Sequence, residues 1–313
     1  LYMLGEDFTA IETRLLEKTA RILTPDILTS ALPAHGVVHA SPIEPGYLIT
    51  KESGMYYEND LLTQKLSARS ISFYPACDTL LYKADVKYMV CDDILYQVDH
   101  TLSKTMIART ETRTPARTVW LGLAVDDSLT DLENISFYLD FPNLTESYEY
   151  LFLLPCTEWS AGGTPIRMEP GIYEKSRLPE EYTRAFFRSY DVMSVIDKEV
   201  MELYNKHFLR VSQPVPLNEV DKEPLPKALS SCFGERVREK MQEKLVWVKI
   251  VFPAHFTPEI PEELHAGINI VPVENKLLHE QTTSLEDTFR VIPLRTGNYE
   301  SLLSVHSVKD SDG

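Results

Sequence analysis

The sequence predicts an α+β protein, in which a β-rich domain carries inserted or flanking helices and is joined to a smaller α+β unit. Three observations lead to this fold class. Short apolar runs separated by proline, glycine and paired aspartates fill much of the first half, and two stretches repeat apolar residues at helical spacing. Prolines also cluster at Pro214, Pro216, Pro224 and Pro226, where we expect a surface linker.

Four parts are expected along the chain. Residues 1–32 form an N-terminal helical segment and residues 33–176 form the β-rich domain. Residues 177–226 hold a helical region and the proline-rich linker, and residues 227–313 form the smaller α+β domain. A chain of 313 residues is long enough for two domains, because single cores stop growing at roughly 250 to 300 residues.

The first helix is expected over residues 8 to 23. Phe8, Ile11, Leu15 and Ile22 recur at helical spacing, and Pro25 ends the helix because it has no amide hydrogen for the next turn. The chain begins without the basic start, apolar run and cleavage site of a secretion signal. We therefore expect an internal fragment whose first helix begins upstream.

Strands are expected next, where β-branched and aromatic residues alternate with turn formers. The run Val119–Val125 is apolar at nearly every position, so it should be a central strand between two layers. Residues 159–164 predict a hairpin, because Gly162 and Gly163 tolerate the positive φ of a tight turn. The other strands expected here are Val37–Ala40, Tyr47–Thr50, Ile71–Tyr74, Tyr88–Cys91 and Ser136–Phe141.

Helices are expected again from Pro179, where a proline followed by carboxylates is typical of a helix start. An apolar stripe at helical spacing then runs from Tyr182 to Phe208. In the last domain we expect short helices at 225–232 and 261–265. Strands are expected there at Leu245–Phe252, Ile268–Val273, Arg290–Ile292 and Leu302–Val308.

The stretch Gly267–Asn275 contains Pro272 inside an otherwise strand-like apolar alternation. Proline has no amide hydrogen to give to a sheet ladder, so we expect Pro272 at an edge strand or a β-bulge, where a partner can dock. A structure in which Pro272 is paired on both sides in a regular ladder would contradict this expectation.

Charge and cysteine content exclude several classes of protein. The formal charge of −16 disfavours general binding to nucleic acid or to an anionic membrane surface. The longest apolar runs are far shorter than the roughly 20 residues of a membrane-spanning helix. The cysteines, with no metal-ligand spacing, favour reduced thiols and a cytoplasmic location. They are Cys77, Cys91, Cys156 and Cys232.

Residues that could carry chemistry have simpler structural explanations. His35 and His39 lie on an expected strand, about 13 Å apart at about 3.3 Å per residue, which is too far for one metal ion. Cys91 adjoins Asp92 and Asp93, whose charge disfavours a reactive thiolate.

Acidic groups complete the set of candidates. Asp126–Asp127 and Glu180–Glu181 suit a turn and a helix start, and Asp310–Gly313 lacks most ligands of a calcium loop. The sequence also lacks the nucleotide-binding, nucleophile-elbow and zinc-protease motifs. We therefore expect no catalytic residue, metal or cofactor.

Several short segments, in colinear order, carry a resemblance to a known family. One is Phe137-Tyr138-Leu139-Asp140, and the strongest lies at Pro272, Val273 and Asn275. The others are Pro33–Pro45, Leu153–Trp159, Phe289–Pro293 and Ser304–Val308. Together these segments resemble the TssF family, also called VasA or ImpG, of bacterial type VI secretion system baseplate subunits. From the resemblance we expect that this chain does not include the family's N-terminal helical portion and C-terminal domain.

The resemblance implies a non-enzymatic structural protein with the fold of contractile-tail baseplate wedge proteins. It would form cytoplasmic wedges with TssG, TssE, TssK and a second TssF copy, and these wedges would support assembly of the sheath and tube. The residues implied as a structural family motif are Phe137, Tyr138, Leu139, Asp140, Trp159, Pro272, Val273 and Asn275.

Two alternatives remain open. One is a phage tail baseplate wedge protein, which the sequence does not separate from a secretion baseplate. The other is a β-sandwich carbohydrate-binding or hydrolytic module, with the Trp159 hairpin or Tyr56–Tyr57 as a sugar platform. Adjacent residues on a strand point to opposite faces, which weakens the tyrosine version.

Overall fold

The computed structural model describes residues 16, 32–57, 71–110, 112–145, 147–172, 200–230, 232–233, 237 and 241–276. Apart from Leu16, the helix expected over residues 8 to 23 lies outside these residues. So do the helix start at Pro179 and the strands expected at Arg290–Ile292 and Leu302–Val308. Contacts divide the chain into two compact units, one of residues 1–35, 55–74 and 274–313 and the other of residues 36–54 and 75–273.

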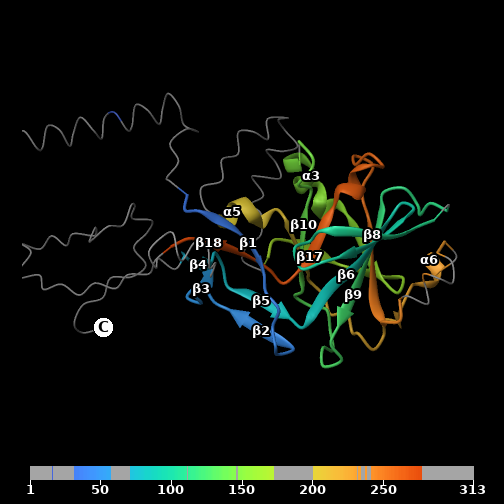
Figure 1. The fold of residues 1–313 in the computed structure, drawn as a ribbon, viewed down its shortest axis with the longest axis horizontal. Coiled ribbons are helices and arrows are strands. Elements are labelled where there is room, and N and C mark those ends of the chain that lie inside the picture. The colour runs from blue at the N-terminus through green and yellow to red at the C-terminus, as the bar shows by residue number, and fades with distance from the viewer. Residues whose placement is uncertain are drawn as a thin grey trace, which may run out of the picture. The chain divides into compact units, whose positions relative to one another are not determined.

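The structure confirms a β-rich α+β fold with a few short helices (Figure 1). The strands are β1 (His35–His39), β2 (Gly46–Ile49), β3 (Met55–Tyr57), β4 (Ile71–Pro75), β5 (Thr79–Tyr82), β6 (Ala84–Cys91), β7 (Ile94–Val98), β8 (Lys104–Arg109), β9 (Thr118–Val125), β10 (Ser136–Asp140), β11 (Glu158–Ala161), β12 (Thr164–Ile166), β13 (Met168–Pro170), β14 (Phe208–Val211), β15 (Lys222–Glu223), β16 (Leu245–Val251), β17 (His265–Ile268) and β18 (Ile270–Glu274). The helices are α3 (Ser147–Leu153), α5 (Val200–Asn205) and α6 (Lys227–Ser230), with 3₁₀ turns η1 (Leu154–Cys156) and η4 (Ile260–Glu263).

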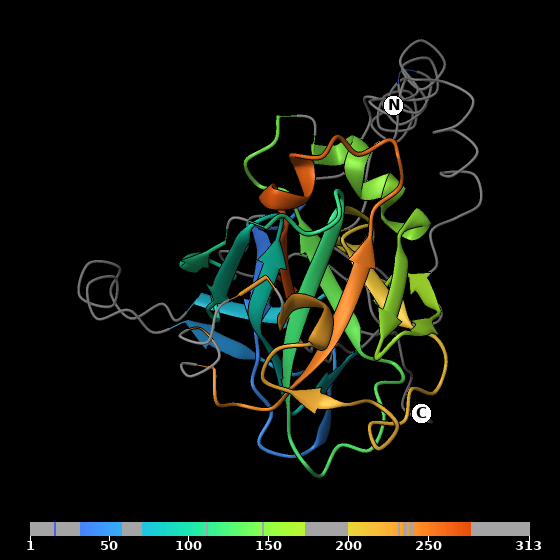
Figure 2. The ribbon, with the colours of Figure 1, turned by 90° about the vertical axis from the view of Figure 1, so that its right-hand side faces the viewer.

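An eight-stranded antiparallel sheet dominates the second unit (Figure 2). Its strands follow the order β12-β11-β16-β9-β6-β7-β8, and β15 pairs with β16. The apolar run at Val119–Val125 is β9, which lies between β16 and β6 as the sequence predicts. The strand expected at Leu245–Phe252 is β16, so a strand from the expected smaller domain joins the sheet of the expected β-rich domain.

A four-stranded sheet in the order β13-β14-β10-β17 packs on one face of the large sheet. Their shared core contains alternate residues of both sheets, because successive side chains of a strand point to opposite faces. Examples are Leu121 on β9, Phe137 on β10 and Val248 on β16, all almost fully buried. The second unit is therefore built as two packed sheets.

Smaller apolar clusters cover the two outer faces. Leu225, Leu229 and Phe233, on and around α6, pack with Trp247 on the outer face of the large sheet. On the outer face of the small sheet, α5 packs its Met201 and Tyr204 against Tyr138 and Phe208. Central strands such as β9 and β10 are thus apolar on both faces.

Gly122 on β9 marks one close approach in the large sheet. It lies directly opposite Trp247 on β16, whose indole ring would come within 3.1 Å of a Cβ atom at position 122. The ring nitrogen of Trp247 donates a hydrogen bond to the carbonyl oxygen of Glu223, 3.1 Å away. The missing side chain at Gly122 therefore makes room for an anchored tryptophan.

The expected hairpin at residues 159–164 is present as β11 and β12. Gly162 and Gly163 connect the strands with φ values of 56° and 88°, the left-handed region that glycine adopts without steric cost. Here the sequence signal was local, so the turn could be read directly.

Three expected elements differ in the structure. The helical stripe ends early, because α5 stops at Asn205 and Phe208 begins strand β14 between β13 and β10. The helix expected at 261–265 is the 3₁₀ turn η4, which ends at Glu263 before strand β17. The strand expected at Ile268–Val273 is broken at Asn269, whose φ is 58°.

In the first unit, β3 and β4 pair in antiparallel fashion, with Tyr56 opposite Ser72. Asn275 joins this unit together: its backbone nitrogen donates to the Ala34 carbonyl at 2.7 Å, and its side-chain amide donates to the Ser72 carbonyl at 2.8 Å. Among the described residues, no helix combines the length and the apolar character needed to cross a bilayer.

Candidate functional site

The segment Phe137-Tyr138-Leu139-Asp140 forms most of β10, a central strand of the small sheet. Phe137 and Leu139 point into the core between the sheets, whereas Tyr138 points to the opposite face against α5. The ring centroids of Phe137 and of Trp159 on β11 lie 4.9 Å apart, so two of the segments that resemble the family meet in the core. Phe137, Tyr138, Leu139 and Trp159 are all buried.

Tyr138 belongs to a small polar cluster with Asp140 and His207. Its ring stacks on His207 at 5.2 Å between centroids, and its hydroxyl donates to Asp140 Oδ2 at 3.3 Å. His207 Nδ1 lies 3.2 Å from the Leu139 carbonyl and 3.5 Å from Asp140 Oδ1. Burial first, then the charge of Asp140, raises the pKa of Tyr138 above its ordinary value, so the hydroxyl stays protonated and acts as a hydrogen-bond donor.

Pro272 and Val273 are buried in β18, and Asn275 is exposed just after it. The expectation that Pro272 lies on an edge strand is wrong, because β18 has β1 on one side and the end of β4 on the other. The carbonyl of Pro272 accepts a hydrogen bond from the Ala76 nitrogen at 2.9 Å. Ala76 directly follows the last residue of β4, itself Pro75, so the missing amide hydrogen falls where the neighbouring strand ends.

Asn269 is a structural residue that the sequence analysis missed. Its side chain is buried and makes three hydrogen bonds: Oδ1 accepts from the Tyr82 nitrogen at 2.8 Å, and Nδ2 donates to the carbonyls of Tyr82 at 2.7 Å and Ala84 at 2.9 Å. Its own carbonyl accepts from the Ala40 nitrogen at 2.9 Å. The available signal was an asparagine between two isoleucines, since asparagine is enriched at positive φ.

Ionisable groups gather where β8 meets η4. The ammonium group of Lys104 lies 5.3 Å from the centroid of the Tyr96 ring and donates to the backbone carbonyl of Glu262. Burial lowers the pKa of Lys104 and raises the pKa of Glu262. Burial likewise lowers the pKa of His265 on β17. These shifts follow from desolvation, and the contacts hold η4 against the sheet.

Cys91 lies beside this group and is buried at the end of β6. Burial, and then the charge of Glu262, raises the pKa of Cys91 to about 12, and Asp92 adds a smaller effect in the same direction. The sequence predicts a poor nucleophile at this position because of Asp92 and Asp93. The direction is as expected, but desolvation is the larger cause.

The histidines and acidic pairs serve structural roles where the structure describes them. His35 and His39 are the first and last residues of β1, so they are as far apart as the sequence predicts. Asp126 lies 2.8 Å from Lys83 Nζ and accepts from the Ser128 nitrogen at 3.0 Å, as expected for a turn. Glu180–Glu181 and Asp310–Gly313 lie outside the described residues.

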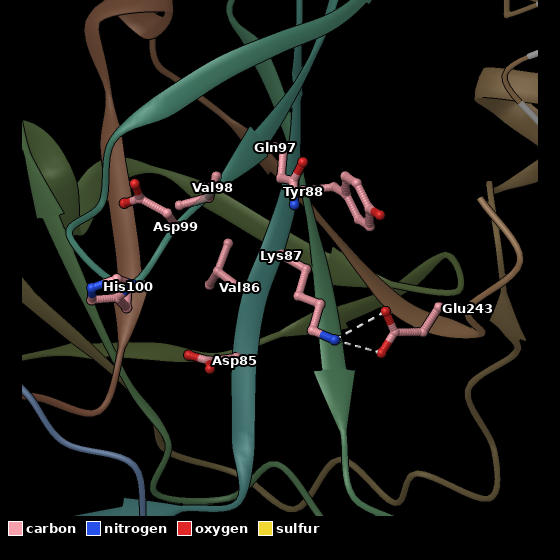
Figure 3. Close-up of a pocket in the computed structure, with 9 residues that line it drawn as sticks. All are labelled: Asp85, Val86, Lys87, Tyr88, Gln97, Val98, Asp99, His100 and Glu243. Carbon is pink, nitrogen blue, oxygen red and sulfur yellow. Dashed lines mark hydrogen bonds and ion pairs between the residues drawn. The ribbon is translucent and has the colours of Figure 1, made fainter. Parts of the chain in front are cut away.

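A hollow of about 250 Å³ is bordered by side chains of β6, β7 and the loop after β7, together with Glu243. Figure 3 shows how these side chains lie. Lys87 Nζ lies 2.8 and 3.0 Å from the two carboxylate oxygens of Glu243, and His39 Nε2 lies 2.9 Å from Asp85 Oδ1. Asp99 accepts hydrogen bonds from the loop that follows it. The charges in this hollow thus already have partners, and in the described part of the chain no three His, Cys, Asp or Glu side chains are grouped to hold a metal ion.

The ion pair between Asp93 and Arg109 makes stability depend on pH. Arg109 Nε donates to Asp93 Oδ2 at 2.7 Å, and this hydrogen bond lowers the pKa of Asp93 below its ordinary value. A lowered carboxyl pKa stabilises the fold above the unfolded pKa of about 3.9, and this contribution is lost as pH falls through the folded value. We expect Asp93→Asn to lower the urea midpoint at pH 7, and the difference from wild type to shrink below about pH 4.

Added salt provides a control for this effect. The Arg109 side chain is 64% exposed, so salt should reduce the difference at pH 7. A difference that stays constant from pH 7 to pH 3 would mean that the ion pair does not act through the charge of Asp93.

Several exposed apolar side chains lie on strands near the start of the second unit. They belong to β1, β2, β5 and the segment between β1 and β2. Their members are Val37, Val38, Ile43, Tyr47, Leu48 and Leu80, and we call them the apolar strand surface. Leu48 and Leu80 lie directly opposite each other in the β2–β5 pair. Paired exposed apolar residues are more typical of an interaction surface than single ones.

Comparisons with known proteins give one structural likeness to report. A chain in a cryo-electron microscopy structure of a type VI secretion system TssK-TssF-TssG baseplate subcomplex matches with a TM-score of 0.37 and 13% sequence identity. The match covers 91% of this chain and 54% of that one, so the chain spans about half the length of the chain it matches. No family model and no curated protein matches the sequence.

Proposed function

We propose that the chain is part of a non-enzymatic baseplate subunit of the TssF (VasA/ImpG) family. It would work in the cytoplasm by packing against TssG, TssE, TssK and a second TssF copy in a wedge that supports sheath and tube assembly. The observation that carries the proposal is the apolar strand surface, which offers Leu48 and Leu80 as a cross-strand pair to a neighbouring subunit. Such permanent interfaces are typically large and apolar.

In this proposal, the segments that resemble the TssF family maintain a fold that the chain would share with that family. Phe137, Tyr138, Leu139 and Trp159 are buried in or beside the core, so they act by packing and are not contact residues. Asn275 holds backbone segments of the first unit together. A family resemblance that falls on such positions reflects how the chain folds, while partner contacts are made by other residues.

The carbohydrate-binding alternative has little support from its proposed platform. Trp159 is 3% exposed, and its ring nitrogen donates to Thr157 Oγ1 at 2.7 Å, so its face is not available to a sugar. Tyr56 is exposed on β3, but one tyrosine is a weaker platform than two rings on one face. Neighbouring genes would distinguish a secretion baseplate from a phage tail baseplate.

Co-purification tests the proposal. The full-length protein is expressed together with its TssG-like, TssE-like and TssK-like genomic neighbours, and the lysate is analysed by size-exclusion chromatography. We expect a complex containing the protein and at least its TssG-like neighbour, which resists high salt because the interface is apolar. Expression with each neighbour omitted serves as the control. A full-length protein that elutes alone in every combination would contradict the proposal.

A further inference from the structure

The edge of β2 is open in the part of the chain that the structure describes. β2 pairs with β5 alone among the described strands, as a two-stranded antiparallel sheet (Figure 1). The Lys83 nitrogen donates to the Pro45 carbonyl at 3.0 Å, which fixes the hydrogen-bonding alternation of the pair. In an antiparallel pair alternate residues bond to the partner, so Tyr47 and Ile49 bond to β5 while the amides of Gly46 and Leu48 point outward.

Asn269 confirms this alternation independently. Tyr82 lies opposite Gly46 in the register, so its backbone groups must point away from β2. They do, because the Tyr82 nitrogen and carbonyl both bond to the side-chain amide of Asn269, at 2.8 and 2.7 Å. The outer backbone groups of Tyr82 are therefore paired by a side chain, whereas those of Gly46 and Leu48 have no such partner among the described residues.

Side chains on both faces of β2 are exposed. Leu48 is 53% exposed and lies opposite Leu80, which is 41% exposed. A pair that is not hydrogen bonded brings its side chains closest together, so the two leucines form one apolar ridge. Tyr47 on the other face is 49% exposed, and Ile43 just before the strand is 92% exposed.

Both edges of the large sheet carry features that prevent further pairing. At one end of the large sheet, β8 has a register shift against β7 and begins and ends with Lys104 and Arg109. At the other end, β12 contains Pro165. Bulges, charges and prolines are the usual means of protecting an edge. The strand Gly46–Ile49 has none of them, although it is short.

Charge at the ends of the strand indicates the kind of segment that fits. Glu44, Glu52 and Asp78 are exposed around β2 and β5, together with two exposed cations, Lys51 and Lys83. Lys83 Nζ is already paired with Asp126 at 2.8 Å. The whole chain carries a formal charge of −16, so a second copy would be repelled at long range, whereas a basic segment would be attracted.

We propose that the free edge of β2 binds an extended, basic segment of a partner protein by β-strand addition. The partner's alternate apolar side chains would pack on Leu48 and Leu80, and its lysine or arginine residues would lie near Glu44 and Glu52. The inference rests on the proposed function, because it names the chemistry of one subunit contact on the apolar strand surface.

The probe for this inference is a synthetic nine-residue peptide in which valine and threonine alternate between two lysines at each end. A matched peptide has glutamate in place of every lysine. Amide hydrogen exchange is measured by NMR on the full chain with each peptide. We expect the basic peptide to slow exchange at Gly46 and Leu48, while Tyr47 and Ile49 are protected with or without it, because β5 already holds them.

Two charge variants separate this edge from the rest of the surface. Leu48→Lys should weaken binding of the basic peptide at least about tenfold, because it puts a like charge on the edge and removes the apolar contact. Met106→Lys adds the same charge at a 58% exposed position on β8 and should leave binding unchanged. Circular dichroism checks that both variants fold.

Several results would overturn the inference. They are equal binding of the acidic peptide, protection that does not alternate along β2, equal effects of the two variants, and dimerisation of the chain through β2. Because the peptide test uses no baseplate protein, its failure leaves the proposed function standing. Failure of co-purification alongside successful peptide binding would instead refute the proposed function alone.

Discussion

Replacing Asn269 with alanine is expected to lower the free energy of unfolding by roughly 3 to 5 kcal/mol, because buried polar groups lose their partners and alanine is strained at positive φ. The side chain is 7% exposed and pairs the nitrogen and carbonyl of Tyr82 and the carbonyl of Ala84. In the variant these groups have no replacement partner among the described residues. The loss therefore loosens β5 and β6 at the point where β17 turns into β18.

Two further variants separate the causes, with urea unfolding as the measurement. Asn269→Gly loses the same hydrogen bonds but adopts a φ of 58° without strain, so it should be no more destabilising than Asn269→Ala. Asn143→Ala is the control, because Asn143 is exposed and its amide donates to Glu263 Oε2 at 2.9 Å, its one partner among the described residues. Its cost should be below about 0.5 kcal/mol. An alanine at 269 that costs no more than this control would show that the network does not hold the fold.

Local patterns were sufficient to predict several elements. The run Val119–Val125 is apolar on both faces because β9 has a core on each side, and that property is visible in the sequence itself. The Gly162–Gly163 hairpin is equally local, since the turn dictates its residues. The β-rich α+β class follows from such elements, because it depends on their kinds and not on how they pair.

Long-range pairing could not be predicted. Pro272 was expected at an edge strand or a bulge because proline cannot donate, but its carbonyl bonds to Ala76, nearly two hundred residues earlier, where β4 ends. The apolar stripe through Phe208 fitted a helix, but Phe208 begins β14, a strand with four buried residues between two other strands. The spacing of apolar residues alone does not distinguish such a short buried strand from a buried turn of helix. Only the three-dimensional neighbours decide these cases.

The exposed edge of β2 was also hidden in the sequence. Gly46–Ile49 and Phe208–Val211 are both short and mostly apolar, yet the first has exposed side chains and the second is buried throughout. The segments that resemble the family include Phe137 and Trp159, which are core residues. A resemblance between sequences marks positions that maintain the fold, and the surface that binds a partner has to be found from exposure and hydrogen bonding.

Arg210→Met is expected to lower the free energy of unfolding by roughly 3 kcal/mol, because it removes one member of a largely buried ion pair. Arg210 lies on β14 directly opposite Glu169 on β13, and its guanidinium donates to Glu169 Oε2 at 3.1 Å and to Asn134 Oδ1 at 2.7 Å. The two charged side chains are 11% and 20% exposed. Without Arg210, the carboxylate of Glu169 loses this charge-assisted hydrogen bond at a largely buried position.

A double-mutant cycle and an exposed ion pair give the controls. Arg210→Met with Glu169→Leu should recover most of the loss, because two apolar side chains then replace both members of the buried ion pair.

Lys87→Met breaks an ion pair with Glu243 whose two side chains are 46% and 44% exposed, and it should lower the free energy of unfolding by less than about 1 kcal/mol. Urea unfolding measures all of them. If the double variant is as unstable as the sum of the single variants, the cost lies in lost packing of the arginine stem and not in the lost ion pair. If Lys87→Met costs as much as Arg210→Met, burial does not set the strength of these pairs.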